Sequence, residues 1–470
     1  GVSMAEQRFL VEGHQVRDFQ IAEAEAILFP YDIDTGLIDI DELPGLHKWV
    51  WPCRTVMGNR QTFSKKSYFE EGRPWWEWHQ IALDRLKTPL SIAFAEVATH
   101  NHFVLDRGGK VFKQTAPVIK LAEGEPVEAH LQLLGLLDSS VACFWMKQEC
   151  FNKDASREGW ESRYQFDGTK MKRFPVASGS VLAWASLLDG LAAELSSLTP
   201  GHGDDVPSTA GWDERRAAAV AVRRRMVGVQ EELDWRCYHL YGVTDEDLSL
   251  PAEEAPALSL GERSFEIVLA RKIAAGQTES SWFARHGSTP ITELPSHWSD
   301  EYRALVERRI ALIAEDRNVR LCEQPENKRR WNWPDWAELE QDALAAWLLE
   351  RLEAEQLWSG AAPLSVAQVA DRVRVDAEFV QVAEVSAGSS DFDLTKLVGD
   401  LVKDDAVPFL AAWRYKPPGL RKRAEWDATW HLQRREDAGE DVGVIAVPPK
   451  YGSGDFLKPA YWKLRGKLDV

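Results

Sequence analysis

The strongest constraint on the fold is a change in hydrophobic spacing near residue 200. Before this point, short apolar runs such as 91–98 (SIAFAEVA) are separated by turn residues, which is the pattern of strands. After it, residues 214–242 repeat apolar side chains on one helical face, from Val222 to Leu240. The spacing predicts an α+β N-terminal region followed by a mainly α-helical C-terminal region.

Individual elements follow from the same patterns. Residues 102–121 predict a hairpin that turns at the Asp-Arg-Gly-Gly stretch 106–109, and residues 130–147 predict one buried helix. Further helices are expected at 301–316, where Ser299 supplies an N-cap, and at 338–358 and 363–403. The ends 407–426 and 447–467 are basic, aromatic and expected to be irregular.

Two breaks in composition suggest domain boundaries. Residues 200–212 (PGHGDDVPSTAGW) are rich in Gly, Pro and Ser, and a second loop follows at 248–261. We therefore expect one domain over 1–180, a linker and long helix over 181–260, and a mainly helical domain over 261–470.

The charge of the chain is unevenly distributed. The net charge is −18, which argues against binding nucleic acid over the whole surface. Residues 46–120, however, hold 12 Lys and Arg against 6 Asp and Glu, whereas the chain outside 46–180 carries a net −22. One basic segment thus lies inside an acidic protein.

The sequence also bears on the compartment. It contains no run of 18 apolar residues, and its five cysteines form no CxxC pair. These features predict a protein of the reducing cytoplasm with no membrane partner.

Common catalytic signatures are missing from the sequence. It contains no GxxxxGK[ST], GxGxxG, GxSxG or HExxH pattern, and no [DN]-P-P-[YFW] motif of amino-methyltransferases. The pair His100 and His102 could face a metal, but no third ligand lies nearby in the sequence. Asp316, Glu326 and Lys328 have the order of a nuclease site without an apolar strand to carry them. We therefore predict no catalytic or metal-binding residue.

Several segments together carry a family resemblance. The aromatic stretch 65–81 (KKSYFEEGRPWWEWHQI), residues 88–112, and 130–147 (HLQLLGLLDSSVACFWMK) resemble the target-recognition region of adenine-specific DNA methyltransferases. In the last of these, Asp138 stands where relatives more often have Asn. Residues 230–243 (QEELDWRCYHLYGV) resemble the helix that follows such regions.

The remainder narrows the family. The stretches 261–295, 328–336 (KRRWNWPDW) and 414–470 are similar to the C-terminal half of the PglX-like methyltransferases of bacteriophage exclusion (BREX) systems, type 2 or phage growth limitation branch. The resemblance implies a target-recognition domain over 1–180 and an S-adenosylmethionine (AdoMet) site in a catalytic half that is not in this sequence. It also implies double-stranded DNA and other defence proteins as partners.

Under this resemblance, the basic segment is the expected DNA-binding surface. Cations would meet phosphates, while Asn, Gln and Arg could read base edges. The predicted DNA-binding residues are Lys48, Arg54, Asn59, Arg60, Gln61, Lys65, Lys66, Arg73, Trp76, His79, His100, Asn101, His102, Arg107 and Lys110.

Three alternatives stay open at this stage. The tryptophans of 73–79 (RPWWEWH) could fill a core rather than line a DNA path. The acidic region 261–470 could be a docking scaffold for other proteins. The basic tail around Arg421 (Arg414, Lys416, Arg421, Lys422, Arg423) could contact phosphate or be solvated.

Overall fold

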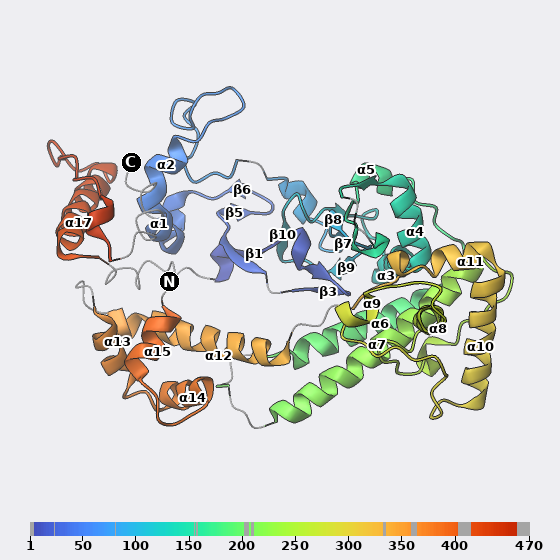
Figure 1. Ribbon diagram of the computed structural model, residues 1–470. Helices are drawn as coiled ribbons and strands as arrows, with labels where there is room; N and C mark the ends of the chain where they lie inside the picture. The colour runs from blue at the N-terminus through green and yellow to red at the C-terminus, as the bar shows by residue number, and fades with distance from the viewer. Residues whose placement is uncertain are drawn as a thin grey trace.

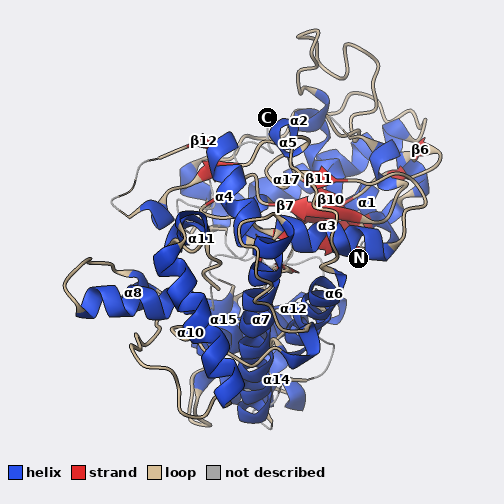
Figure 2. Ribbon diagram, turned by 90° about the vertical axis from the view of Figure 1, so that its right-hand side faces the viewer, coloured by secondary structure: helices blue, strands red, loops and turns tan. Residues whose placement is uncertain are grey.

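The fold described below is that of a computed structural model. It describes residues 4–22, 24–79, 81–154, 156, 158–201, 206–207, 211–331, 335–358, 364–402 and 415–457. Strands gather in the N-terminal part and long helices in the remainder (Figures 1 and 2). The predicted fold class is therefore confirmed, whereas the boundaries at 180 and 260 stay predictions.

Three small sheets form the N-terminal part. One has the order β10-β1-β4, the second β11-β7-β9 and the third β12-β13-β8. Their strands are β1 (Gln7–Val11), β4 (Glu25–Leu28), β7 (Ser91–Phe94), β8 (Val97–Ala98), β9 (Phe103–Asp106), β10 (Lys110–Phe112), β11 (Val118–Ile119), β12 (Phe151–Asn152) and β13 (Tyr164–Gln165). The same part contains two separate two-stranded ribbons. In one, β2 (Val16–Arg17) pairs with β3 (Gln20–Ile21), and in the other β5 (Tyr31–Asp32) pairs with β6 (Gly36–Leu37).

The prediction that the two strands of 102–121 pair with each other as a hairpin is wrong. Both strands form, but β9 pairs antiparallel with β7, and β10 pairs parallel with β1. Gly108 and Gly109 have φ values of 104° and 80°, which only glycine adopts easily, so the turn leads the chain away into another sheet. The partner strand β1 lies about a hundred residues away in sequence, which local patterns do not reveal.

The buried helix expected at 130–147 is two helices. α3 (Val127–Leu137) ends at Asp138, and α4 (Ser140–Glu149) begins where the Ser139 hydroxyl accepts a hydrogen bond from the Ala142 N–H. The serine N-cap restarts the helix in a new direction. This break brings Asp138 and Ser139 into the core, where they meet residues from distant parts of the chain.

The longest described helix is α7 (Trp212–Leu240). It packs along α6 (Leu182–Leu198), and its apolar face joins a core that extends from Val11 to Trp336. The predicted helix at 214–242 is thus confirmed, with Gly242 following it at φ 65°. On the far side α7 meets α8 (Ser264–Ala274) and α10 (Asp300–Glu315), and the Ser299 N-cap of α10 is confirmed. Short helices α9 (Trp282–Arg285) and α11 (Arg317–Cys322) complete this region.

Residues 323–331 run back from the helices to the N-terminal sheets and carry buried cations. Lys328 lies among three carboxylates, of which Glu323 Oε1 is 2.6 Å and Asp234 Oδ2 is 2.9 Å from its Nζ. Asp316 instead caps α11 through the Asn318 and Val319 N–H groups. These contacts disfavour a nuclease site made by Asp316, Glu326 and Lys328, because Lys328 instead pairs with Asp234 and Glu323 inside the core.

The last helices form separate clusters. α12 (Trp336–Glu353) reaches away from the main core to α13 (Val366–Val373), α14 (Ala377–Ala387) and α15 (Leu394–Leu401), whose apolar faces make a second core (Figure 1). Residues 407–426 were expected to be irregular. Of these, 407–414 lie outside the described residues, and 417–426 belong instead to a helix, α17 (Pro417–Asp437). Pro417 and Pro418 occupy its first turn, where the missing N–H costs nothing.

Candidate nucleic-acid interface

The three tryptophans of 73–79 all pack inside the N-terminal region. Trp75 is buried against Trp51, at 6.1 Å between ring centroids. Trp76 is half-buried and donates its indole N–H to the Ile38 carbonyl, and Trp78 packs edge-on against Phe29. This arrangement favours the core interpretation of the cluster over a tryptophan-lined DNA path.

Two of the predicted DNA-binding arginines are engaged in holding this cluster. Arg60 donates to the carbonyl oxygens of Trp75 at 3.0 Å and Glu77 at 2.6 Å. Arg73 forms a two-point ion pair with Glu77, and both guanidinium groups lie about 4.5 Å from the centroid of the Tyr68 ring. These contacts fasten the loop 73–79 to α2 (Arg54–Gly58) and leave the two cations less able to meet phosphate.

Other predicted residues are also engaged internally. Arg54 lies 3.8 Å from Asp437 of α17, Arg107 pairs with Asp189 of α6, and Lys110 pairs with Asp106. Asn101 is buried and donates to the Leu137 and Ser139 carbonyls at the break between α3 and α4. The side chain of Lys48 lies outside the described residues.

A projecting loop, residues 59–72, carries the predicted residues that remain exposed. It follows α2 and stands out from the body of the molecule in both views (Figures 1 and 2). Asn59, Gln61, Lys65 and Lys66 are exposed, and so is His79, which follows the loop in sequence. Neither lysine forms an ion pair with any carboxylate in the described part of the chain.

The loop is internally braced rather than extended. Thr62 N–H donates to the Lys66 carbonyl at 2.8 Å, and Lys65 takes a left-handed φ of 66°. The Glu71 carboxylate accepts from the Thr62 hydroxyl at 2.7 Å and from Ser64. The bracing engages the Glu71 carboxylate with two hydroxyls, although Lys66 is close enough to help lower the pKa of Glu71 and of Glu70.

The tip also exposes an aromatic residue that sequence reasoning missed. Phe63 is 77% exposed, and its ring lies 5.0 Å from that of His79. Its signal was present as one apolar residue in the polar stretch QTFSKKS. The loop therefore presents Phe63, its most exposed ring, together with two lysines that form no direct ion pair among the described residues. Phe69 of the same loop is 41% exposed, but its ring lies against Arg54.

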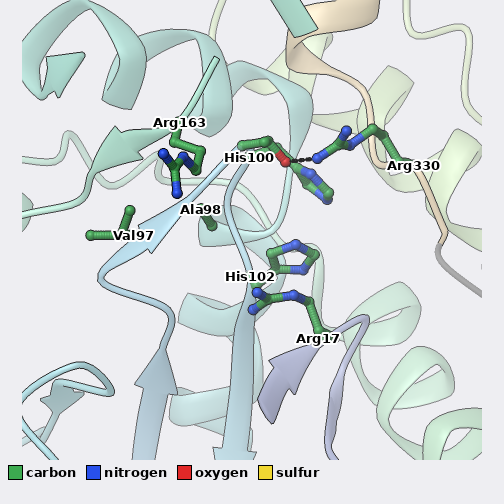
Figure 3. A pocket seen from close by; sticks show the side chains of 8 residues that line it. Arg17, Val97, Ala98, His100, His102, Arg163 and Arg330 are labelled. Atoms are coloured by element: carbon green, nitrogen blue, oxygen red, sulfur yellow. Dashed lines mark hydrogen bonds between the residues drawn. The ribbon is translucent and has the colours of Figure 1, made fainter. Parts of the chain in front are cut away.

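His100 and His102 lie in a different place, a pocket of about 160 Å³ that we call the arginine pocket (Figure 3). It is lined by Arg17, Arg163, Arg330, Thr99, His100 and His102 among others. Burial, followed by the charge of nearby cations, holds the pKa of both histidines well below the usual value, so both are neutral. They are buried, unlike the exposed base-reading residues predicted from the sequence.

The structure also supplies the third possible metal ligand that the sequence did not reveal. The ligand atoms of Asp18, His100 and His102 lie within 4.8 Å of one another. Asp18 was missed because it stands more than 80 residues before the histidines. Its carboxylate already faces Arg329 at 3.2 Å.

Arg329 also contacts Asp138, whose ionisation gives a testable prediction. Full burial raises the pKa of Asp138 to about 7 although Arg329 opposes the rise. An unfolded Asp has a pKa of about 3.9, so between these values the folded state binds more protons. The stabilisation that the protonated Asp138 gives to the folded state is therefore complete below about pH 4, and it is lost as pH rises through 7. The Asn side chain of Asp138→Asn cannot ionise. As pH rises from 5 to 8, the unfolding free energy of this variant should therefore rise by about 1 kcal/mol or more relative to that of the native chain.

Urea unfolding at the two pH values measures this difference. The exposed Asp34→Asn is the matched control, and its difference from the native chain should be the same at both pH values. An Asp138→Asn difference that also stays constant would show that Asp138 is ionised throughout.

The basic tail is only partly described. Lys422 lies 2.8 Å from Asp455, and Arg423 lies 3.6 Å from Asp427, whereas Lys416 and Arg421 are exposed. Arg414 lies outside the described residues. The tail patch is thus split between internal pairs and solvent.

Comparison with known proteins identifies the family. Residues 226–470 match the family described as a domain of unknown function, DUF7008. The chain belongs to this family. It is also 46% identical over 490 residues to the "Adenine-specific methyltransferase PglX" of Streptomyces coelicolor, across 98% of this chain. The expected resemblance to PglX-like proteins is confirmed.

The match has a defined extent. The chain spans 40% of the length of that relative, which is consistent with a fragment of a PglX-like protein. Among the described residues, no helix is long and apolar enough to cross a membrane.

Proposed function

We propose that this chain is the DNA-contacting, target-recognition part of an adenine-N6 DNA methyltransferase that acts in bacterial defence against phage, in the cytoplasm. The complete protein would flip an adenine out of double-stranded DNA and methylate it from AdoMet. This chain would select the site and hold the duplex. The similarity to an adenine-specific methyltransferase supports the reaction, and the 59–72 loop supports the role.

The exposed ring beside unpaired lysines is the observation that carries the proposal. Lysines that lack carboxylate partners can neutralise phosphates and release counterions. An exposed apolar side chain can enter a base step and open the stack, which lowers the cost of flipping a base. Phe63, Lys65 and Lys66 combine both features on one braced loop.

AdoMet does not fit either of two pockets of the described region. The arginine pocket is lined by guanidinium groups, which would repel a sulfonium cation. A second pocket, of about 310 Å³, is lined by apolar residues such as Phe144 and Trp145 and by no carboxylate that could accept from ribose hydroxyls. We therefore assign the AdoMet site to the catalytic half of the complete protein.

A salt series with this chain tests the proposal. The double variant Lys65→Glu/Lys66→Glu should weaken binding to a short duplex by about tenfold or more at low salt. Its slope of log K against log[salt] should be shallower by about 2. Fluorescence anisotropy measures both quantities. The control Arg215→Glu/Arg216→Glu makes the same charge change on the exposed start of α7, and it should bind like the native chain.

Phe63→Ala separates the wedge from the electrostatic contact. It should weaken binding without changing the salt slope, and it should reduce the fluorescence rise of 2-aminopurine placed in the duplex. If the native chain binds no duplex even at low salt, the loop proposal is wrong. The acidic helical region would then favour the alternative, a docking scaffold for other defence proteins.

A further inference from the structure

We propose that the arginine pocket binds a phosphate group. It lies where β2, β8, β13 and the returning segment 323–331 meet, away from the 59–72 loop. Figure 3 shows Arg17 beside His102 and Arg330 beside His100, with Arg163 at the other edge. The site is independent of the contacts used for the proposed function.

The first argument is positive charge that no direct ion pair neutralises. Arg17 donates only to the Gly13 and Val16 carbonyls, at 2.9 and 2.6 Å, and Arg330 donates to the Thr99 hydroxyl. Neither guanidinium forms an ion pair with a carboxylate among the described residues. Burial lowers the pKa of both, and the more distant charge of Asp18 offsets only part of this. Charges taken from water without a counter-ion are costly, so an anion between them would be stabilising.

Arg163 adds a third guanidinium at the open edge of the pocket. Its Nε holds Asp154 at 2.7 Å, and its side chain is 61% exposed. Asp154 and Glu161 are the acids on this side, and Asp18 Oδ1 lies 3.7 Å from His102 Nδ1. None of these three carboxylates lines the pocket.

The second argument is an unsatisfied imidazole. His100 is 2% exposed, and neither of its ring nitrogens has a hydrogen-bond partner. A buried polar group is normally paired, so an absent pair calls for a bound group. His102 Nδ1 accepts from the Asp18 N–H at 3.4 Å, which puts the proton of its neutral ring on Nε2. Each ring can then donate one hydrogen bond to an oxyanion.

A divalent metal is the competing occupant, because Asp18, His100 and His102 could ligate one. Two observations disfavour it. Asp18 Oδ1 is already bound by Arg329. The cations that help depress the pKa of both histidines, Arg329 and Arg330 among them, would also repel a dication. The same potential attracts an anion.

Thermal unfolding with inorganic phosphate tests the proposal directly. About 20 mM phosphate should raise the midpoint by about 2 °C or more over KCl of matched ionic strength, because it binds only the folded state. The dissociation constant of phosphate from isothermal titration calorimetry should agree with the value calculated from this rise in the midpoint. Equal midpoints in phosphate and KCl would overturn the proposal.

Variants locate the effect. Arg163→Gln changes an exposed side chain, so it should fold normally and weaken phosphate binding about tenfold or more. Arg330→Lys keeps the charge but not the fork and should weaken binding less than Arg330→Gln. The matched control Arg173→Gln removes an arginine that is 67% exposed and pairs with Glu149, so its binding should be unchanged. Equal weakening in the control would overturn the site.

Competition distinguishes the source of the phosphate. Displacement by a short duplex would assign the site to a DNA backbone phosphate, whereas tighter binding of adenosine monophosphate would assign it to a small nucleotide. Stabilisation by Zn²⁺ that His100→Gln abolishes, with none from phosphate, would replace the anion by a metal. A failure of the Lys65 and Lys66 variants to weaken DNA binding leaves all of these results unaffected.

Discussion

Replacing Lys328 by Met should lower the free energy of unfolding by about 3–5 kcal/mol, because it leaves buried carboxylates without their counter-charge. The ammonium group contacts Glu323 at 2.6 Å and Asp234 at 2.9 Å, with Glu231 at 3.7 Å. All four side chains are at most 2% exposed. Burial alone would lower the pKa of Lys328, but these acids raise it above the usual value.

The loss should depend on pH with a definite sign. Burial already raises the pKa of Glu323, and removing Lys328 would raise it further. The carboxylates of the variant then gain protons on folding as pH falls towards the pKa of an unfolded Glu, about 4.3. The difference in unfolding free energy between the variant and the native chain should therefore be smaller at pH 5 than at pH 7. Urea unfolding followed by tryptophan fluorescence at pH 7 and pH 5 measures both values.

The matched control is Lys113→Met. Lys113 also pairs with a glutamate, Glu12 at 2.6 Å, but its side chain is 53% exposed. Solvent screens that pair, so the control should unfold at the native urea concentration. A Lys328→Met variant as stable as this control would show that the buried cluster contributes nothing to the fold.

Replacing Trp282 by Ala should cost about 3–5 kcal/mol through a different mechanism, the opening of a cavity. Trp282 is fully buried, and its ring meets those of Trp160 and Phe265 edge-on, both at 5.4 Å between centroids. Its indole N–H donates to Glu266 Oε1 at 3.0 Å, and Glu266 in turn pairs with Arg263. The substitution thus removes a ring and one donor to a buried carboxylate.

Two variants separate these contributions. Trp282→Phe keeps most of the ring volume but not the N–H, so its loss should be smaller than that of the alanine variant. Phe151→Ala removes a ring that is 63% exposed and should change stability little. If Trp282→Ala cost no more than Phe151→Ala, the aromatic cluster around Trp160 would not be packed as described.

The predicted DNA-binding cations differ from the exposed cations of the structure. The surplus of cations in 46–120 pointed to a DNA surface. However, partners within the same chain engage Arg54, Arg60, Arg73, Arg107 and Lys110. Composition counts a charge without its partner. Among the predicted cations whose side chains the structure describes, the exposed lysines of the 59–72 loop are the ones without an ion-pair or backbone partner.

Helices that depend on local signals followed from the sequence. The apolar face of α7 and the Ser299 cap of α10 are determined within a few turns, because helical hydrogen bonds join residues four apart. The strands β9 and β10 were also found, but their partners were not. A strand bonds to whichever segment lies beside it, and local spacing carries no information about that segment.

The arginine pocket was decided by tertiary structure alone. His100 and His102 were visible as a pair, but Arg17 and Arg330 come from positions more than 80 and more than 220 residues away. The sequence by itself determined the α+β to helical order, the family and the basic segment. Tertiary structure decided which cations are paired, which stay free and which surround buried histidines, because the energy of a charge depends on the neighbours that burial brings to it.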